Sequence, residues 1–316
     1  MIDVIIPAYN ARKTIEQTLT SIAFQSIVDK LNIYIINDCG KEDYEDIVQY
    51  YSNFMNIKEL KLEQNSGPGQ ARQYGIDNTN SEYIIFIDSD DVFADTNSIS
   101  SLYETLSNSK TDIVVSKFLE ELENTFIPKN FQYIWMHGKM YKRSYLKNNN
   151  IRFNNTYTNE DCGFNQLCYM SNANYIELDR ITYIWRNNTE SITRTNTLES
   201  RTKYLKLFVY NMIWSIEESL KRNYNEHRLS EIIYGTLIAS YHYYLQNIEI
   251  FTKENLLQEL AILIKYHNEH PITEEQKLSI IQNQLYTIEG HNIYQVYNPT
   301  ITIEDFLNLL SSKVGA

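Results

Sequence analysis

Short apolar runs in the first third of the chain alternate with stretches of helical periodicity. Apolar and β-branched residues dominate residues 3–6, 32–36 and 83–87, and a weaker run lies near 57–62. Runs of about four to eight such residues, bounded by turn-forming residues, are typical of buried strands. We therefore predict four strands, the first of which is ended by Pro7.

The stretches between these runs predict helices. Apolar side chains recur every three or four positions from residue 11 to 24, and further helical patterns lie near 42–51 and from Gln70 onward. Strands separated by helices favour βαβ units, so the predicted fold class is α/β with a mostly parallel sheet.

From about residue 196 the pattern is helical throughout. Three apolar stripes at helical spacing begin at Tyr204, Ile232 and Leu256. A capping box, Thr273-x-x-Gln276, predicts the start of a further helix after Pro271. A last short helix is expected over residues 303–310.

The two patterns predict two domains, an α/β domain over residues 1–195 and an all-α domain over residues 196–316. A hydrophobic content of 43% excludes a disordered chain. The net charge of −12 argues against a sequence-independent grip on nucleic acid, which depends on basic side chains. No apolar run approaches the ~20 residues that span a bilayer, and the N-terminus lacks a signal-peptide pattern.

The cysteines bear on the compartment. Cys39, Cys162 and Cys168 are scattered, and none of them belongs to a C-x-x-C pair. Reduced thiols are the expected state of such a set, so we predict a cytoplasmic location.

Polar residues follow three of the predicted strands where they end. They are Tyr9-Asn10, Asp38 and the run Asp88-Ser89-Asp90-Asp91. In parallel sheets ligands bind beyond the carboxyl ends of the strands, so these residues are expected to form one edge of a site.

The run from Asp88 to Asp91 is the first candidate for chemistry. Carboxylates past a buried strand supply the oxygen ligands that a hard divalent cation prefers. The alternative is an acidic turn that only caps the next helix.

Three other motifs are weak when taken one at a time. Pro7-Ala8-Tyr9-Asn10 offers an aromatic ring for a base, although Tyr9 also suits a core. Asn65 to Arg72 contains a glycine loop leading into a helix, which allows close approach to a phosphate, and Arg72 in a first helical turn would oppose the helix dipole. Glu160-Asp161 is an acidic pair of a kind that is usually solvated.

In this order and spacing the motifs resemble a family 2 glycosyltransferase of the GT-A fold, over about residues 2–195. Three further stretches resemble the same family: Gly138 to Arg143, Tyr183-Ile184-Trp185-Arg186 and Ser191-Ile192-Thr193. The resemblance implies a Rossmann-like, mostly parallel sheet flanked by helices, followed here by the all-α domain.

The resemblance also implies roles for the residues at the strand ends. Tyr9, with Pro7 and Asn10 beside it, would pack on the nucleotide base, and Asp38 would accept the uracil N–H. Gly67 and Arg72 would lie near the nucleotide or its phosphates. Asp88 and Ser89 would bind ribose, and Asp90 with Asp88 would hold Mn²⁺ or Mg²⁺. Asp161 would be the general base, with Glu160 beside it.

The implied activity is metal-dependent, inverting transfer of a single sugar from a UDP-sugar to a hydroxyl of a glycan, teichoic acid or protein acceptor. Two departures matter. The second strand ends in Asn37-Asp38-Cys39-Gly40, where the family usually has Asp-Asp-Gly-Ser, and the chain has no Gln-x-x-Arg-Trp motif, which argues against processive synthesis.

Two alternative functions stay open. One is a catalytically silent module that binds a nucleotide or glycan, and the other is a sugar nucleotidyltransferase, which would be expected to have a glycine-rich loop after the first strand. The helical domain is expected to bind the acceptor or to form a homo-oligomer, and peripheral membrane association is left open.

Two aromatic features have both a functional and a structural interpretation. His137 suits either the rim of the site or a core. Aromatic residues of the helical half suit either a sugar-stacking groove or a packed interior; they are Trp214, Tyr241, Tyr243 and Tyr244.

Overall fold

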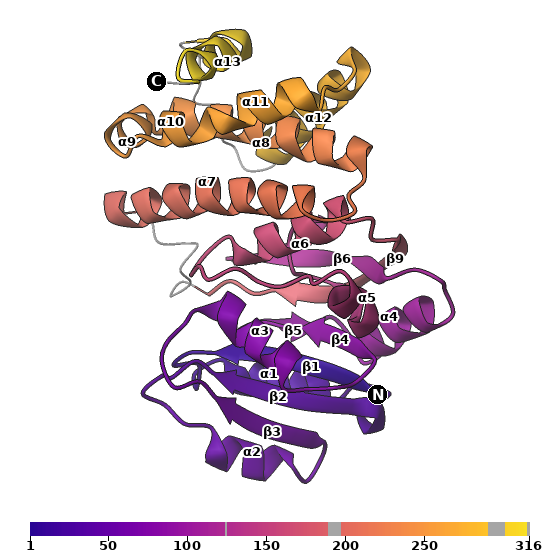
Figure 1. Cartoon of the computed structure of the whole chain (residues 1–316). Coiled ribbons are helices and arrows are strands. Elements are labelled where there is room, and N and C mark those ends of the chain that lie inside the picture. The colour runs from indigo at the N-terminus through magenta and orange to yellow at the C-terminus, as the bar shows by residue number, and fades with distance from the viewer. Residues whose placement is uncertain (124, 189–196, 290–300, 315–316) are drawn as a thin grey trace. The chain divides into compact units, whose positions relative to one another are not determined.

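The structure is a computed structural model that describes residues 1–123, 125–188, 197–289 and 301–314. The chain divides into two compact units, residues 1–168 with 173–195 and residues 169–172 with 196–316 (Figure 1). Ser191-Ile192-Thr193 of the resemblance lies outside the described residues.

The first unit is built on a nine-stranded sheet of mixed direction, with strand order β3-β2-β1-β4-β8-β6-β9-β5 and β7 paired to β6. The strands are β1 (Ile2–Ala8), β2 (Leu31–Asn37), β3 (Asn56–Lys61), β4 (Tyr83–Phe86), β5 (Val92–Phe93), β6 (Ile113–Leu122), β7 (Thr125–Lys129), β8 (Lys139–Lys142) and β9 (Tyr175–Trp185).

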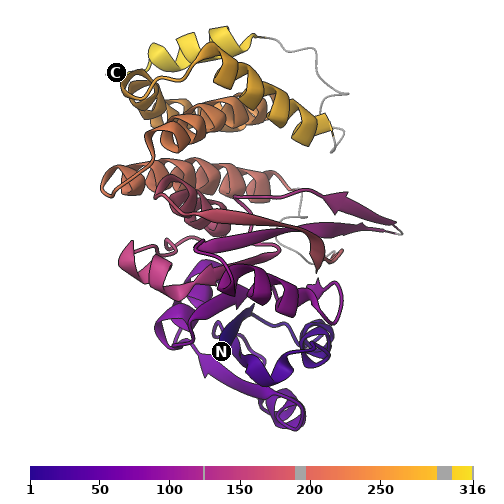
Figure 2. The ribbon, with the colours of Figure 1, turned by 90° about the vertical axis from the view of Figure 1, so that its right-hand side faces the viewer.

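The four predicted strands are β1 to β4, and every pairing among them is parallel. The rest of the sheet is mixed. β8 runs antiparallel to both β4 and β6, whereas β9 runs parallel to β6 with a register shift near Ser116. Figure 2 shows the ribbon of this sheet from a second side. The α/β fold class is therefore confirmed, and most of the parallel pairing lies among β1 to β4, the first strands of the chain.

Helices cover both faces of this sheet. They are α1 (Ile15–Ala23), the 3₁₀ turn η1 (Val28–Lys30), α2 (Glu45–Tyr51), α3 (Pro68–Asp77), α4 (Ser98–Ser107), α5 (Arg143–Asn148) and α6 (Glu160–Met170). Alternate side chains of β1 explain the two layers. Ile2, Val4 and Ile6 belong to one buried cluster with the apolar face of α1, while Ile5 faces α3 at Gly75.

Two element boundaries differ from the sequence prediction. Pro7 lies inside β1 because the pairing of β1 with β4 stops at Ile5, so the absent N–H of Pro7 removes no bond on that side. α3 begins at Pro68, a residue suited to a first helical position, rather than at Gln70. Arg72 consequently lies in the second turn of α3, and the prediction that it opposes the helix dipole in the first turn is wrong.

In its described part, the second unit is built from helices alone. They are α7 (Leu198–Leu220), α8 (Glu226–Gln246), α9 (Ile248–Lys253), α10 (Leu256–Leu260), α11 (Ile262–Glu269), α12 (Glu274–Glu289) and α13 (Ile303–Ser311). The predicted capping box at the start of α12 is present, because the Thr273 N–H donates to Gln276 Oε1 and the Gln276 N–H donates to Thr273 Oγ1. The third apolar stripe is divided between α10 and α11.

Three of the four aromatic residues considered in the second unit, Tyr241, Tyr243 and Tyr244, pack against other residues of that unit. The Tyr244 ring lies 5.3 Å from that of Phe306, and the Tyr243 ring lies 4.9 Å from that of Phe208. The Tyr241 hydroxyl donates to the Ile301 carbonyl. These contacts support the packed-interior interpretation over a sugar-stacking groove.

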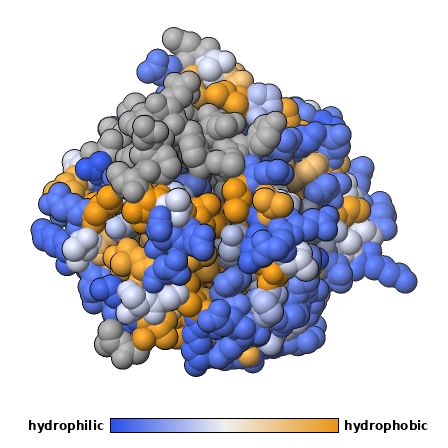
Figure 3. All heavy atoms as spheres, turned by 90° about the horizontal axis from the view of Figure 1, so that it is seen from above, coloured by the Kyte–Doolittle hydropathy of each residue, from blue (hydrophilic) through white to orange (hydrophobic). Residues whose placement is uncertain are grey.

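The surface of the second unit mixes hydrophilic and apolar side chains in the view of Figure 3, as is ordinary for folded proteins. Among the described residues, no helix has the length and apolar character needed to cross a membrane.

Candidate functional site

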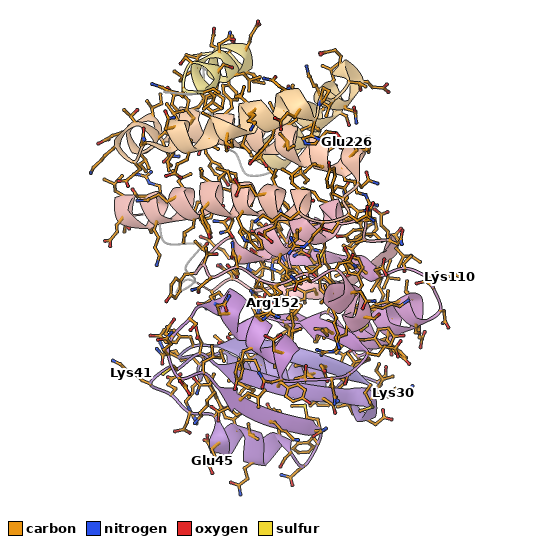
Figure 4. All side chains as sticks on the ribbon, viewed as in Figure 1. Lys30, Lys41, Glu45, Lys110, Arg152 and Glu226 are labelled. Carbon is orange, nitrogen blue, oxygen red and sulfur yellow. The ribbon has the colours of Figure 1, made fainter. Side chains whose placement is uncertain are left out.

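Because β1, β2 and β4 are parallel neighbours, their carboxyl ends lie at the same edge of the sheet. Tyr9-Asn10 follows β1, Asp38 follows β2 and the run from Asp88 to Asp91 follows β4. Figure 4 shows the side chains of this unit, with Lys41 marking the turn after β2.

Asp38 organises the glycine loop that precedes α3. Its carboxylate accepts the N–H of Ser66 at Oδ1 and the N–H of Gly67 at Oδ2, both at 2.7 Å. Burial raises the pKa of Asp38, and the two N–H donors oppose that rise. Each carboxylate oxygen accepts more than one hydrogen bond, so Asp38 keeps capacity for a ligand donor.

The residues after β1 differ in exposure. Pro7 is buried, whereas 53% of Tyr9 is exposed, so its ring is accessible at the edge of the sheet. Asn10 adopts a left-handed backbone conformation at φ 51°, and its Oδ1 accepts the N–H of Lys41 at 2.8 Å. The Asn10 side chain therefore stabilises the turn after β2.

Asn37, the departure from the family pattern, is also bound to its surroundings. Its amide nitrogen donates to Glu59 Oε1 at 2.8 Å, and its amide oxygen accepts the N–H of Gly40 at 3.1 Å. The amide thus holds the turn after β2 to the neighbouring strand.

Arg72 joins three separate elements at the centre of the site. One terminal nitrogen lies 2.5 Å from Asp88 Oδ1 after β4, and the other lies 2.7 Å from Glu160 Oε1 at the start of α6. The Arg72 and Glu160 side chains are only 4% and 6% exposed, so this ion pair is shielded from water, whereas Asp88 stays partly open to it. Its Nε is buried without a hydrogen-bond partner in the described structure.

Glu160 and Asp161 open helix α6, where the helix dipole favours negative charge. Glu160 is buried and paired with Arg72, whereas Asp161 is half-buried and accepts the N–H of Cys162 at 2.8 Å. Burial raises the pKa of Asp161, and the positive charge of Arg72 opposes the rise. A carboxylate with a raised pKa is a stronger proton acceptor once it is ionised.

The acids of the run after β4 differ in burial: Asp91 is buried, whereas Asp88 and Asp90 are half-buried. Asp91 is buried and accepts the Tyr183 hydroxyl at 2.5 Å and the Arg186 N–H at 2.8 Å. Asp90 accepts the side-chain amide of Asn188 at 2.8 Å, and the Asp88 side chain is 33% exposed. Ser89 is half-buried.

This donor set suits a hard divalent cation. Ligand atoms of Asp88, Asp91 and His137 all lie within 4.8 Å of one another. Among the described residues Asp90, predicted to hold the metal together with Asp88, is not a member of this group, and its carboxylate accepts the Asn188 side chain. The carboxylate oxygens match the preference of Mn²⁺ or Mg²⁺. Burial lowers the pKa of His137 to about 4, so its imidazole is neutral near pH 7.

Sequence reasoning missed the anchoring role of Asp91. The family-like stretch Tyr183-Ile184-Trp185-Arg186 carries both donors to Asp91, so that stretch was the available signal. The partner of Asp90, Asn188, stands 98 residues away and had no motif to indicate it.

Comparison with known sequences identifies the family. The sequence model described as glycosyl transferase family 2 matches residues 3–164, which is half of the chain. The chain belongs to glycosyl transferase family 2.

Among curated proteins of this family, the poly(ribitol-phosphate) β-N-acetylglucosaminyltransferase TarS of Staphylococcus aureus is 29% identical over 192 residues, covering 55% of this chain and 33% of TarS. The minor teichoic acid biosynthesis protein GgaA of Bacillus subtilis is 36% identical over 116 residues, covering 35% of this chain and 26% of GgaA. The chain therefore spans about a third or less of the length of these relatives.

A solved structure supports the fold of this family member over nearly its whole length. The crystal structure of S. aureus TarS 1–349 in complex with UDP has a TM-score of 0.68 at 20% identity, covering 98% of this chain and 90% of that chain. The likeness confirms the predicted GT-A fold followed by a helical region.

Proposed function

We propose that the chain is a metal-dependent, inverting glycosyltransferase that moves one sugar from a UDP-sugar to a hydroxyl of an acceptor glycan. The observation that carries the proposal is the position of Arg72 between Asp88 and Glu160. This bridge joins Asp88, an acid assigned to the nucleotide, to Glu160, the residue that precedes the proposed general base Asp161.

The nucleotide is assigned to the edge formed by β1, β2 and the glycine loop. Tyr9 offers its exposed ring to the base, and Asp38 accepts the uracil N–H while it holds the loop at Gly67. Asp88 and Ser89 lie where ribose would bind. A cation held by Asp90 and Asp88 would neutralise the diphosphate leaving group.

Asp161 is proposed as the general base. The acceptor hydroxyl has a high pKa and must lose its proton as it attacks the anomeric carbon, so a carboxylate is required on the face opposite the diphosphate. Glu160 is proposed to hold the start of α6 through Arg72 rather than to take the proton. A single displacement of this kind inverts the anomeric carbon.

UDP-N-acetylglucosamine and a polyol-phosphate polymer are the first substrates to test. TarS is named as an N-acetylglucosaminyltransferase acting on poly(ribitol-phosphate), and GgaA as a teichoic acid biosynthesis protein. These names support the donor class and the acceptor class. The match covers only a third or less of each relative, so the acceptor of this chain is a proposal. Peripheral membrane association, oligomerisation and a cytoplasmic location stay predictions.

The first alternative is a silent binding module. Binding alone would not require the buried ion pair of Glu160 with Arg72 next to the half-buried Asp161, so this arrangement favours an enzyme. The second is a sugar nucleotidyltransferase, and release of pyrophosphate from UTP and a sugar phosphate would favour it.

The test combines calorimetric UDP binding with turnover of UDP-N-acetylglucosamine on a ribitol-phosphate acceptor. We expect Mn²⁺-dependent UDP binding that Asp90→Asn weakens at least tenfold. Asp161→Asn should bind UDP like the wild type but lose at least about 100-fold in kcat, because general base catalysis contributes this much. Asp179→Asn is the matched control, since its side chain is 83% exposed in a surface ion pair.

Three outcomes would contradict the proposal. They are UDP binding that ignores the metal, wild-type turnover by Asp161→Asn, and retention of configuration at the anomeric carbon of the product.

A further inference from the structure

The start of α3 and the chain segment from Phe153 to Glu160 are joined along their length. The Gln70 side-chain amide donates to the Asn154 carbonyl at 2.8 Å, and the Phe153 N–H donates to Gln73 Oε1 at 3.0 Å. This segment leads directly into the acidic pair of α6. Helix α3 and the segment from Phe153 to Glu160 are therefore held together by hydrogen bonds.

The glycine loop contacts the same segment at Tyr157. The Tyr157 hydroxyl donates to the Asn65 carbonyl at 3.2 Å. A Cβ atom on Gly67 would lie 2.8 Å from Tyr157 Cδ1, so the ring rests against the Gly67 backbone. Gly67 also has φ +86°, which favours glycine on its own account.

Gly69 has no such conformational reason to be glycine. It lies in the first turn of α3 and is absent from the residues with positive φ. A glycine in a helix is less favourable than alanine by about 1 kcal/mol, so the position calls for another explanation.

The explanation is space for Glu160. A Cβ atom on Gly69 would lie 2.6 Å from Glu160 Cγ and 2.9 Å from Glu160 Cβ, closer than such atoms approach one another in proteins. The Glu160 carboxylate is bound to Arg72 at 2.7 Å on the same helix as Gly69. α3 therefore limits Glu160 at two points, the bare backbone of Gly69 and the guanidinium of Arg72.

We propose that Gly69 is a positioning residue. Because glycine has no side chain, Glu160 can pack against α3, and this contact determines the position of Asp161 at the start of α6. The inference rests on the proposed function for the role of Asp161. A methyl group at residue 69 displaces Glu160 from Arg72, and Asp161 follows because it is the next residue of the same helix. The nucleotide edge is spared, since Asp38 contacts the loop at Ser66 and Gly67.

The test compares Gly69→Ala with Gly75→Ala. Both replacements add a methyl group to α3, but at Gly75 the added Cβ lies 2.6 Å from Ile5 Cγ2 in the core, away from the acidic pair. The measurements are kcat, KM and UDP affinity with the full chain, the thermal midpoint, and a crystal structure of each variant.

For Gly69→Ala we expect kcat to fall about 10- to 100-fold with UDP affinity within twofold of the wild type, and Glu160 to have left Arg72 in the crystal structure. For Gly75→Ala we expect a lower thermal midpoint with kcat within twofold of the wild type. The effect of Gly69→Ala on kcat should also be smaller in a Glu160→Ala background, because the main clash is then gone.

A Gly69→Ala structure in which Glu160 stays bonded to Arg72 would overturn the inference, and so would equal losses of kcat in the two alanine variants. Absence of turnover in the wild type would instead overturn the proposed function, and the crystal structures would still decide whether Gly69 seats Glu160.

Discussion

At the scale of single residues, Arg72 determines the electrostatics of the candidate site. It is almost fully buried, and its two carboxylate partners come from different elements. A buried guanidinium of this kind is costly to remove, because its partners are left as uncompensated charges. Lysine is a poor substitute, since its single ammonium lacks the two-pronged geometry that reaches both acids.

The charge of Arg72 predicts a shift in the pH dependence of the reaction. Asp161 must be ionised to accept a proton, so the rate falls as the pH drops through the pKa of Asp161. Burial raises that pKa and Arg72 lowers it, so Arg72→Gln should move the acid limb of kcat/KM to higher pH. The measurement is the pH profile of kcat/KM for wild type and variant.

Two companion variants make this prediction specific. Arg72→Lys keeps a positive charge, so its acid limb should stay near that of the wild type even where kcat falls. Arg152→Gln is the control, because Arg152, which is labelled in Figure 4, is half exposed and pairs with Asp77. An unchanged acid limb in Arg72→Gln would show that Arg72 does not act on the base.

At the scale of elements, helix capping in the second unit offers a local test of stability. Thr302 opens α13, where its Oγ1 accepts the N–H of Asp305 at 3.1 Å and the Asp305 carboxylate accepts the N–H of Thr302 at 2.9 Å. The helix then buries Phe306 and Leu310. Thr302→Ala should cost about 1 kcal/mol of unfolding free energy, measured by urea denaturation.

The conservative variant Thr302→Ser retains the hydroxyl and should lose much less. Equal losses in the two variants would assign the effect to the threonine methyl group and not to the cap.

Periodicity predicted the elements whose signal is local. β1, β2 and β4 are short apolar runs that are largely buried, and the capping box of α12 lies within four residues, so both were predictable from the sequence. β3 gave a weaker signal, because only Ile57 of its six residues is buried. β9 was not predicted, because most of its positions are only half-buried and do not form an apolar run. β6 was also missed, although its first four residues are buried.

The contacts within the site were harder to predict from the sequence than the residues that form it. The motifs supplied Arg72, Asp88 and Glu160, but Arg72 and Glu160 stand 88 residues apart and nothing in the motifs shows that they touch. Arg72 pairs with two carboxylates, and its predicted place near the nucleotide or its phosphates stays a prediction. Whether Asp38 binds uracil and Asp161 takes the proton stays a prediction.

At the scale of the whole molecule, helix α6 bears on whether the second unit is separable. α6 begins with the acidic pair in the first unit, yet Tyr169 to Asn172 at its end are grouped with the second unit. The Arg228 guanidinium lies 4.8 Å above the Tyr169 ring, and the Asn225 N–H donates to the Met170 carbonyl at 2.8 Å. The end of α6 is thus stabilised by residues of the helical part of the chain.

Deletion of residues 196–316 should consequently destabilise α6 and not only remove a separate domain. We expect a truncated protein that is poorly soluble or has a lower thermal midpoint, with a larger loss of turnover than of UDP affinity, because Asp161 opens α6 whereas Asp38 follows β2. Arg228→Met in the full chain removes the cation from the Tyr169 ring together with the hydrogen bond from Arg228 to the Tyr169 carbonyl, and should cost about 1 kcal/mol. A truncated protein with wild-type thermal midpoint and turnover would show that the helical unit is modular, and its role would then be restricted to the acceptor or to assembly.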